Sequence, residues 1–245
     1  MEYHQSAPRS MKRQSNLGRA ILFTFLGILA SGNLAATPNY DQWFLRVVSH
    51  GDTDVTFALP EEFNVTVSAS QAALASKFVP ANQKMLSLFL TSNQYRYAML
   101  ESNNGLDNSP FTEASLQEAF AQYTTYLNDD TERRKLATEF TTTVNDRMSS
   151  DSAMSRFSMS IEKPLLMEVF NRTKSSFSFL ALVGVNAVIK GEKKRLVTVD
   201  STTIIGFKGK WLSLYLYEPY LGPDSYENIK RETAAIVAKT VQQNE

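Results

Sequence analysis

The chain has 245 residues, no cysteine, and 25 basic against 25 acidic residues, so its formal net charge is zero. The absence of cysteine excludes disulfides and cysteine-bound metal centres. A chain without excess positive charge lacks the electrostatic surface by which proteins bind nucleic acids or anionic membranes. Its length is sufficient for a well-buried core that needs no covalent cross-link.

The first 35 residues have the pattern of a secretory signal peptide. Lys12, Arg13 and Arg19 precede an apolar run of 11 residues, 20–30, which small residues follow. This order of a basic start, an apolar core and a small-residue exit is typical of export signals. The run is shorter than the roughly 20 residues that span a bilayer, so an uncleaved anchor over residues 20–36 is the alternative. Met11 is an alternative start, because the ten residues before it add nothing that a signal needs.

We therefore assign residues 1–35 to the signal peptide and its N-terminal extension, and residues 36–245 to a single domain. Loss of the first 35 residues removes four basic residues and one acidic residue, which leaves 21 basic and 24 acidic residues and a net charge of −3. An exported chain without cysteine relies on packing alone, which suits a bacterial envelope. We expect a periplasmic or secreted protein, with anchoring to the inner membrane as the alternative.

The first half of this domain begins with strand-like patterns. Apolar residues alternate over 55–59 and over 63–67 around a turn at Pro60, which predicts a first hairpin. A short helix is expected over 71–77, where Pro80 limits its extension. A second strand pair is expected over 85–90 and 95–100.

A polar segment and two helices follow. Residues 101–110 are rich in Asn, Ser, Asp and Gly and are expected to form a loop. Apolar residues at helical spacing predict helices around 116–127 and 136–148. Asp129, with Glu132 three residues later, resembles a capping box at the start of the second helix.

The second half predicts an antiparallel meander. A strand over 164–171 leads into a long strand over 176–189, which is apolar on both faces and is therefore expected to be covered on both sides. Strands over 195–207 and 211–217 meet at Lys208-Gly209-Lys210, where Gly209 can supply the positive φ of a tight turn. A terminal helix with one apolar stripe is expected to begin at Gly222-Pro223.

Strands, helices, strands and a final helix thus follow one another. Helices at these two positions can cover both faces of one mainly antiparallel sheet. The fold class expected is α+β, arranged as an α/β/α sandwich.

Two passages carry a resemblance to a known fold family. One is FALPEEFNVTV, residues 57–67, and the other is FKGKWLSLYLYEPY, residues 207–220, followed by an amphipathic helix. Together they resemble the PsbP-like (Ran-binding Mog-type) α/β/α sandwich found in exported bacterial proteins. The resemblance covers about Asp54 to Asn244. It implies binding or assembly roles more often than catalysis, and it defines no functional residue.

Motifs for metal or nucleophilic chemistry are scarce. Only His50 remains after export, which argues against a zinc site, and no metal or other cofactor is expected. Ser160 and Lys163 match S-x-x-K, but Pro164 follows at once and the segment reads as extended, so the two side chains would diverge.

Acidic and aromatic residues in the meander supply the remaining candidates. Asp200 in the middle of a strand and Glu218 at the end of the next could act as a pair of catalytic carboxylates. The same acids could instead line a ligand site or be held by neighbouring hydroxyls. The candidate ligand-binding residues share one expected sheet region: Tyr95, Tyr97, Asp200, Tyr215, Tyr217 and Glu218. The alternative is that a helix covers the tyrosines and makes them part of the core.

Three functional hypotheses remain open at this point. The first is a non-catalytic exported domain that binds an unidentified protein or small ligand in the cell envelope. The second is a hydrolase of envelope material that uses Asp200 or Glu218. The third is a membrane-tethered form of the binding domain that retains residues 20–30.

Overall fold

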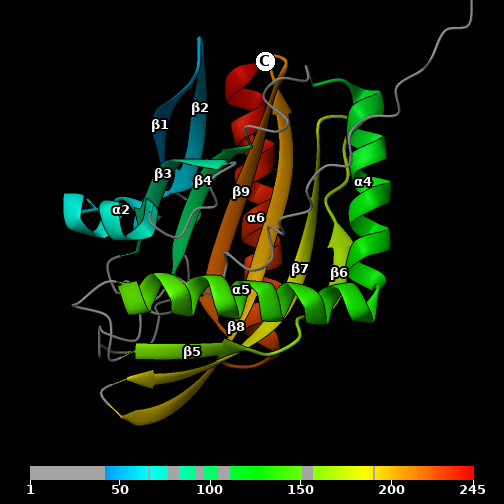
Figure 1. The fold of residues 1–245 in the computed structure, drawn as a ribbon. Coiled ribbons are helices and arrows are strands. Elements are labelled where there is room, and N and C mark those ends of the chain that lie inside the picture. The colour runs from blue at the N-terminus through cyan, green and yellow to red at the C-terminus, as the bar shows by residue number, and fades with distance from the viewer. Residues whose placement is uncertain are drawn as a thin grey trace, which may run out of the picture.

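The computed structural model describes residues 42–65, 67–76, 83–91, 96–103, 111–150, 157–189 and 191–245. They form an α+β fold built on a curled, antiparallel sheet of seven strands in the order β3-β4-β9-β8-β7-β5, with β6 also paired to β7 (Figure 1). The sheet strands are β3 (Gln83–Leu90), β4 (Tyr97–Asn103), β5 (Phe157–Ile161), β6 (Leu165–Phe170), β7 (Ser176–Ile189), β8 (Glu192–Phe207) and β9 (Lys210–Pro219). The predicted antiparallel sheet is confirmed.

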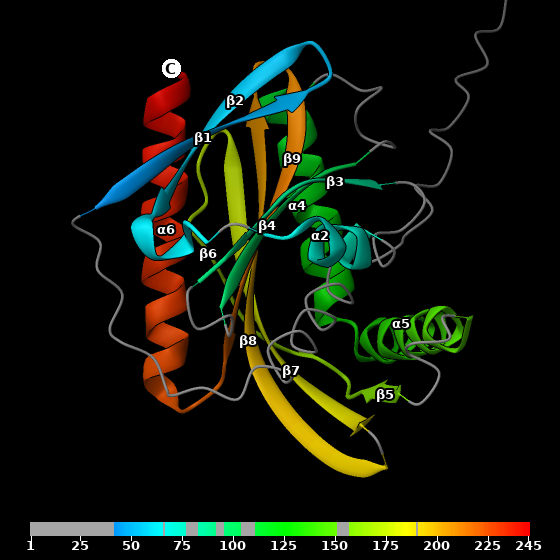
Figure 2. The same cartoon turned by 90° about the vertical axis from the view of Figure 1, so that its left-hand side faces the viewer.

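Helices lie on both sides of this sheet. Helix α6 (Pro223–Asn244) covers one face, together with the hairpin of β1 (Trp43–His50) and β2 (Thr53–Pro60). The opposite face meets α4 (Glu113–Asn128), α5 (Asp130–Ser150) and the short α2 (Ala69–Ser76). Figure 2 shows the sheet between α6 on one side and α4 with α5 on the other, which is a sandwich of three layers.

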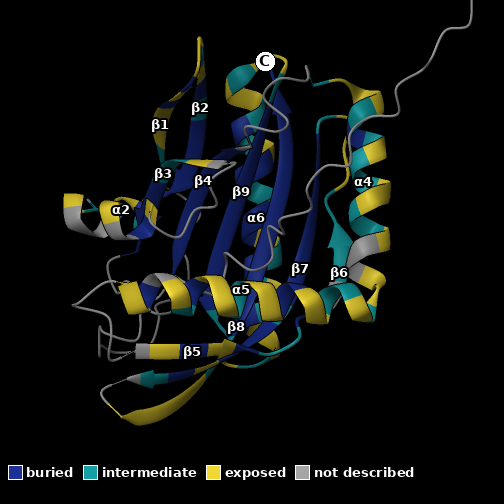
Figure 3. Ribbon diagram, in the orientation of Figure 1, coloured by how far each residue is buried: buried dark blue, intermediate teal, exposed yellow. Residues whose placement is uncertain are grey.

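The meander β7–β8–β9 is the centre of the structure, and its strands are buried along most of their length (Figure 3). Phe207 pairs with Lys210 across a two-residue turn. Gly209 has φ +78°, as the sequence predicts, and Lys208 also has a positive φ of 46°. Positive φ at both turn residues matches a type I′ turn, whose twist agrees with that of the flanking strands.

Alternation along the meander separates two cores. Leu212, Leu214 and Leu216 of β9 pack in the core under α6. Trp211, Tyr215 and Tyr217, on the odd positions of the same strand, pack in the core on the α4–α5 side. The odd positions of β7 from Phe177 to Val185 join this second core, while Leu180 joins the first. The prediction that β7 is covered on both sides is confirmed.

The predicted first hairpin is wrong in its pairing. Residues 55–59 belong to β2, which pairs with β1 and not with residues 63–67. Gly51, with φ +66°, provides the turn between the two strands. After Pro60 the chain forms a short 3-10 helix, η2 (Glu61–Phe63), and Val65 makes an isolated bridge to Leu90.

The outer edge of β2 is covered by side chains of α6. Asn244 accepts a hydrogen bond from the Thr56 backbone N–H at 3.0 Å and donates one to the Thr56 carbonyl at 2.8 Å. The Thr240 hydroxyl accepts a hydrogen bond from the backbone N–H of Ala58 at 3.2 Å. The last two turns of the final helix therefore bond this strand edge in place of another strand.

The remaining helix predictions agree with the structure. Asp129 caps α5, because its carboxylate accepts hydrogen bonds from the backbone N–H groups of Thr131 (2.8 Å) and Glu132 (3.2 Å). The extended segment predicted before β7 consists of two strands, β5 and β6, on either side of residues 162–164. Strand β4 continues to Asn103, so the predicted loop begins later than Glu101.

Some predictions lie outside the described residues. They include the signal peptide and its possible retention as an anchor, Tyr95, and residues 104–110 of the expected loop. Among the helices that the structure describes, none combines the length and apolar character needed to cross a membrane.

Gly206 in β8 provides a test of this packing. A Cβ atom at this position would lie inside van der Waals contact of the Phe111 ring, which stacks edge-on against Trp211 with centroids 5.0 Å apart. We expect Gly206→Ala to lower the free energy of unfolding by about 1–3 kcal/mol, the usual cost of overpacking. Urea denaturation measures this change.

A double-mutant cycle is the control for this prediction. In a Phe111→Ala background the added methyl group no longer meets a ring, so most of its extra cost should disappear. An equal cost in both backgrounds would show that Phe111 is not the residue that requires glycine here.

Candidate functional site

Three of the predicted site residues form one row across the sheet. Tyr97 of β4 pairs with Tyr217 of β9, and Tyr217 pairs with Asp200 of β8. Residues directly opposite one another share a face, so all three side chains lie on the α4–α5 side. The rings of Tyr97 and Tyr217 stack with centroids 4.5 Å apart and planes 18° apart.

The next row extends this group. Tyr215 pairs with Thr202, and both are fully buried on the same face. We call these five residues, Tyr97, Asp200, Thr202, Tyr215 and Tyr217, the Asp200 stripe. The rings belong to the core that the sheet shares with α2, α4 and α5, which is the alternative that the sequence left open.

Asp200 is the polar group of the stripe that requires explanation. It is 1% exposed, and neither of its carboxylate oxygens makes a hydrogen bond of ordinary geometry. Burial raises the pKa of Asp200 well above its usual value, and the hydroxyls of Thr198 and Tyr217 offset only part of that rise. The Thr202 hydroxyl, two residues along the same strand, also lacks a hydrogen-bond partner. The hydroxyls of Thr198 and Tyr217 are therefore the polar neighbours of the buried Asp200 carboxyl group.

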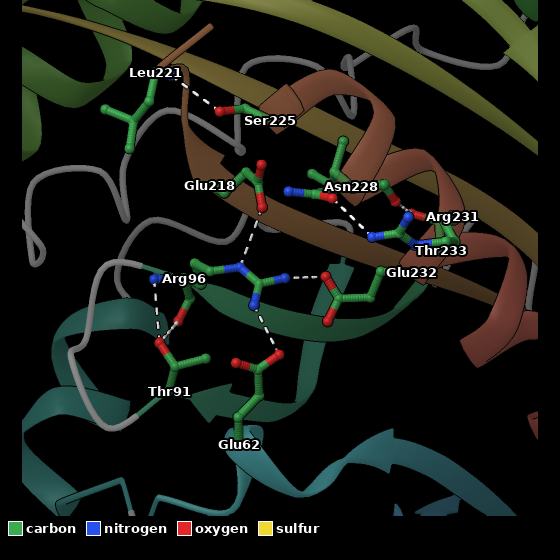
Figure 4. A network of polar contacts seen from close by, with 11 residues as sticks. Glu62, Thr91, Arg96, Glu218, Leu221, Ser225, Asn228, Arg231, Glu232 and Thr233 are labelled. Carbon is green, nitrogen blue, oxygen red and sulfur yellow. Dashed lines mark hydrogen bonds and ion pairs between the residues drawn. The ribbon is translucent and has the colours of Figure 1, made fainter. Parts of the chain in front are cut away.

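Glu218 belongs to a different group on the opposite face. It follows Leu212, Leu214 and Leu216 on the side of β9 that α6 covers, and its carboxylate accepts a hydrogen bond from Arg96 Nε at 3.1 Å. Arg96 Nη1 donates to Glu62 at 2.7 Å, and Nη2 donates to Glu232 of α6 (Figure 4). We call these four residues the Arg96 cluster.

Local structure fixes the position of Arg96. The residue directly precedes β4, and its backbone N–H and carbonyl both bond the Thr91 hydroxyl, at 3.3 and 3.0 Å. Its guanidinium lies over the Phe63 ring, 5.4 Å from the ring centroid. Glu62 comes from η2, Glu218 from β9 and Glu232 from α6, so one side chain links four elements.

The Arg96 cluster contains more acid than base. Desolvation raises the pKa of Glu218 to about 7 and that of Glu232 to about 8, although the charge of Arg96 acts in the opposite direction on both. Desolvation lowers the pKa of Arg96, but its three carboxylates more than offset this, so that pKa is raised. At neutral pH the arginine is therefore charged, and Glu232 holds a proton for most of the time.

Sequence reasoning identified Glu218 but missed its partners. The signal available was a charged residue at a position where the pattern requires burial. Arg96 is in phase with Ala98 and Leu100, and Glu232 lies on the apolar stripe of α6 between Ile229 and Ile236. Such a residue is almost never fully buried unless it is paired.

Other sequence candidates are separate from these two groups. Ser160 of β5 is exposed, and Lys163 forms an ion pair with Asp130 at 2.5 Å. His50 is buried at the end of β1. Within the described ranges, no group of three His, Asp or Glu side chains is placed to hold a metal ion.

Comparison with known proteins shows similarity in fold only. No protein-family profile and no curated protein sequence matches this chain. The solved structure of the Ran-binding protein Mog1p of Saccharomyces cerevisiae is similar over 83% of this chain and 93% of that one, with 13% identity and a TM-score of 0.34. PsbP (CyanoP) of Synechocystis sp. PCC 6803 is similar over 84% of this chain and 97% of that one, with 11% identity and a TM-score of 0.35.

These two structures bear the names of the fold family that the sequence passages resemble. The identities and TM-scores carry no argument about function. The functional reasoning below therefore rests on the geometry of this chain.

The raised pKa values predict how stability depends on pH. Glu218 and Glu232 hold protons in the folded protein up to about pH 7 and 8, whereas the unfolded chain releases them near the ordinary value of 4.5. The folded state binds more protons over this interval, so stability is greatest near pH 5 and falls as pH rises to 8. Each group contributes a slope of at most about 1.4 kcal/mol per pH unit. Urea unfolding between pH 5 and 8.5 measures the trend.

Glu232→Gln is the matched variant, because the amide imitates the protonated acid. The unfolding free energy of the variant should depend on pH less steeply than that of the wild-type protein. The difference in slope corresponds to at most one bound proton. An unchanged slope would contradict the assignment of a proton to Glu232.

Removal of the Arg96 guanidinium should destabilise the protein strongly. Arg96→Met leaves buried carboxylates without a counter-charge, and we expect a loss of about 3–5 kcal/mol at pH 8. The loss should be smaller at pH 5, where the acids take up protons. Arg134→Met is the control, since Arg134 forms an exposed pair with Asp130 and should cost no more than about 1 kcal/mol. Similar losses for the two variants would contradict a structural role for the Arg96 cluster.

Proposed function

We propose that this protein is a non-catalytic binding or accessory domain exported to the bacterial cell envelope. One observation supports the non-catalytic part above all others: Asp200 and Glu218, the candidate catalytic pair, lie on opposite faces of the sheet.

The register explains why the two acids diverge. Asp200 lies directly opposite Tyr217, so these two side chains share a face, and Glu218 is the next residue along β9. Successive residues of a strand point to opposite faces. A pair of hydrolytic carboxylates must flank a single glycosidic bond, about 5–10 Å apart with the sugar between them. A sheet that separates the two acids removes that arrangement.

The surroundings of each acid support the same proposal. Glu218 is 6% exposed and is bonded to Arg96, which makes it part of a structural link. Asp200 is buried among aromatic rings on the other face. The hydrolase hypothesis then depends on one acid acting alone, and the binding hypothesis is the better supported.

Export is supported by the sequence. Lys12, Arg13 and Arg19 before the apolar run 20–30, with small residues after it, favour a cleaved signal and a periplasmic or secreted domain. Retention of residues 20–36 as an inner-membrane anchor is the alternative form of the same function.

An enzymatic assay tests the non-catalytic assignment. Purified protein incubated with cell-wall polysaccharide should release no reducing ends above the level of a heat-denatured sample. Asp200→Asn and Glu218→Gln should leave this result unchanged. Release that either substitution abolishes, in a variant that remains folded by circular dichroism, would establish a hydrolase and overturn the proposal.

Sequencing of the mature N-terminus tests export. We expect the protein recovered from the periplasmic fraction of a bacterial host to begin near residues 33–37, because the small residues there suit signal peptidase. A protein recovered from the membrane fraction with residues 20–30 intact supports the tethered form. Recovery of the uncleaved chain in the cytoplasm would contradict export.

A further inference from the structure

The two edges of the β1–β2 hairpin differ. Side chains of α6, from Thr240 and Asn244, bond the outer edge of β2. Within the part of the chain that the structure describes, β1 pairs with β2 and with no other strand. Figure 1 shows β1 at the margin of the molecule, with β2 between it and α6. One edge of this two-stranded sheet is therefore capped within the chain, and the other edge pairs with no described strand.

The register identifies the backbone groups on the outer edge of β1. The N–H groups of Thr56 and Ala58 bond side chains of α6, so they point away from β1. In an antiparallel pair, residues directly opposite one another either both bond across the pair or both point away from it. Val47 lies opposite Thr56 and Leu45 lies opposite Ala58. The N–H and C=O groups of Leu45 and Val47 therefore point to the outer edge.

This edge lacks the features by which proteins prevent strand edges from pairing. Leu45 and Val47 are apolar and 52% and 65% exposed, and the next outward residue, Ser49, is uncharged. The strand contains no proline, and its eight pairs with β2 run without a bulge. Charges, prolines and bulges are the usual means of blocking an edge. A regular edge without them is a template for another strand, which would satisfy its backbone groups.

We propose that β1 pairs antiparallel with β1 of a second copy of this chain, across a two-fold axis at Val47. The two hairpins then form one sheet of four strands. Because α6 caps the β2 edge in each copy, neither outer edge of that sheet is open, and association stops at the dimer. This assembly is independent of the proposed function.

The position of the axis follows from charge and from the length of the strand. An axis at Arg46 would place two arginines directly opposite each other, which is unfavourable. An axis at Leu45 would pair only residues 43–47 of each strand, whereas an axis at Val47 pairs residues 44–50. With the axis at Val47, Arg46 lies opposite the apolar Val48 of the second copy.

The same register brings opposite charges together at the ends of the paired strands. Trp43 would lie opposite Gly51 of the second copy, beside the Asp52 of that copy. The Lys239 ammonium group lies over the Trp43 ring, 5.2 Å from its centroid. The Asp52 side chain is 86% exposed, although Lys210 of its own chain lies 3.3 Å away, so it retains room for a second basic partner.

A contact of this kind is small. Each copy contributes one strand of eight residues, whereas a stable interface uses about 20–30 residues a side. We therefore expect a reversible dimer with a dissociation constant in the micromolar range. Sedimentation velocity of the purified, full-length mature protein should show an average mass that rises with concentration toward that of two chains.

Val47→Pro tests whether the backbone of β1 makes the contact. Proline removes the outward N–H group, which β2 does not use, so the hairpin should remain folded. We expect this variant to stay monomeric at concentrations where the wild-type protein is mostly dimeric. Val47→Thr keeps the N–H group and should still dimerise. Leu165→Thr is the control for loss of an exposed apolar side chain, because Leu165 of β6 is 51% exposed, and it should dimerise like the wild-type protein.

Single cysteines locate the axis, because the chain has no cysteine of its own. Residues opposite one another in a hydrogen-bonded antiparallel pair have Cα atoms about 5.5 Å apart, which suits a disulfide. Val47→Cys should therefore form a covalent dimer under mild oxidation. In Leu45→Cys and Ser49→Cys, the two copies of the cysteine would be offset by about 13 Å along the strands, and cross-linking should be much slower.

Several results would overturn the proposal. They are a wild-type protein that stays monomeric at every concentration, a folded Val47→Pro variant that dimerises normally, loss of the dimer in Leu165→Thr, and cross-linking of a flanking cysteine as fast as that of Val47→Cys. A monomeric wild-type protein that binds a synthetic peptide of alternating valine and threonine would also overturn it, because the occupant is then a strand of another protein. None of these results bears on the proposed function, which the polysaccharide assay tests separately.

Discussion

The alternation of side chains along β9 is the constraint on which the rest of the structure depends. Consecutive residues Tyr217 and Glu218 enter different layers, one among aromatic rings and the other beside an arginine. Strand β8, paired with β9 over ten residue pairs, must follow the same alternation. A shift of one residue in this register would place the leucines of β9 where its tyrosines now pack, and both cores would lose their fit.

The Arg96 cluster and Asp200 are both buried polar groups, but their surroundings differ. Arg96 uses three of its donors on three carboxylates and so connects the first part of the domain with its last strand and last helix. Its excess of acid is accommodated by protons, which makes the cluster sensitive to pH in a range where most carboxyl groups are fully ionised. Asp200 has no such base beside it. Burial raises the pKa of Asp200 well above its usual value, and the hydroxyls of Thr198 and Tyr217 are the polar groups that act on it.

Sequence reasoning succeeded where one local pattern determines the structure. The three long strands of the meander alternate clearly, and Gly209 marks the turn between the last two, so both faces of β9 could be predicted. The first hairpin failed because Leu45 and Val47 are apolar but exposed, which hides the alternation of β1. The Arg96 cluster was missed because its ion pairs join residues 34, 122 and 136 positions apart, and no spacing within a segment reveals such contacts.

The bonds from Thr240 and Asn244 to β2 have a consequence for the biogenesis of the chain. A nascent polypeptide emerges from the ribosome with its N-terminal strands first, and the groups that cover this strand are among the last to arrive. Until then the backbone of Thr56 and Ala58 offers an open template to any extended neighbour. Loss of a few C-terminal residues, by a nonsense codon or a protease, would leave this edge of β2 permanently exposed. Other chains could then pair with it and aggregate.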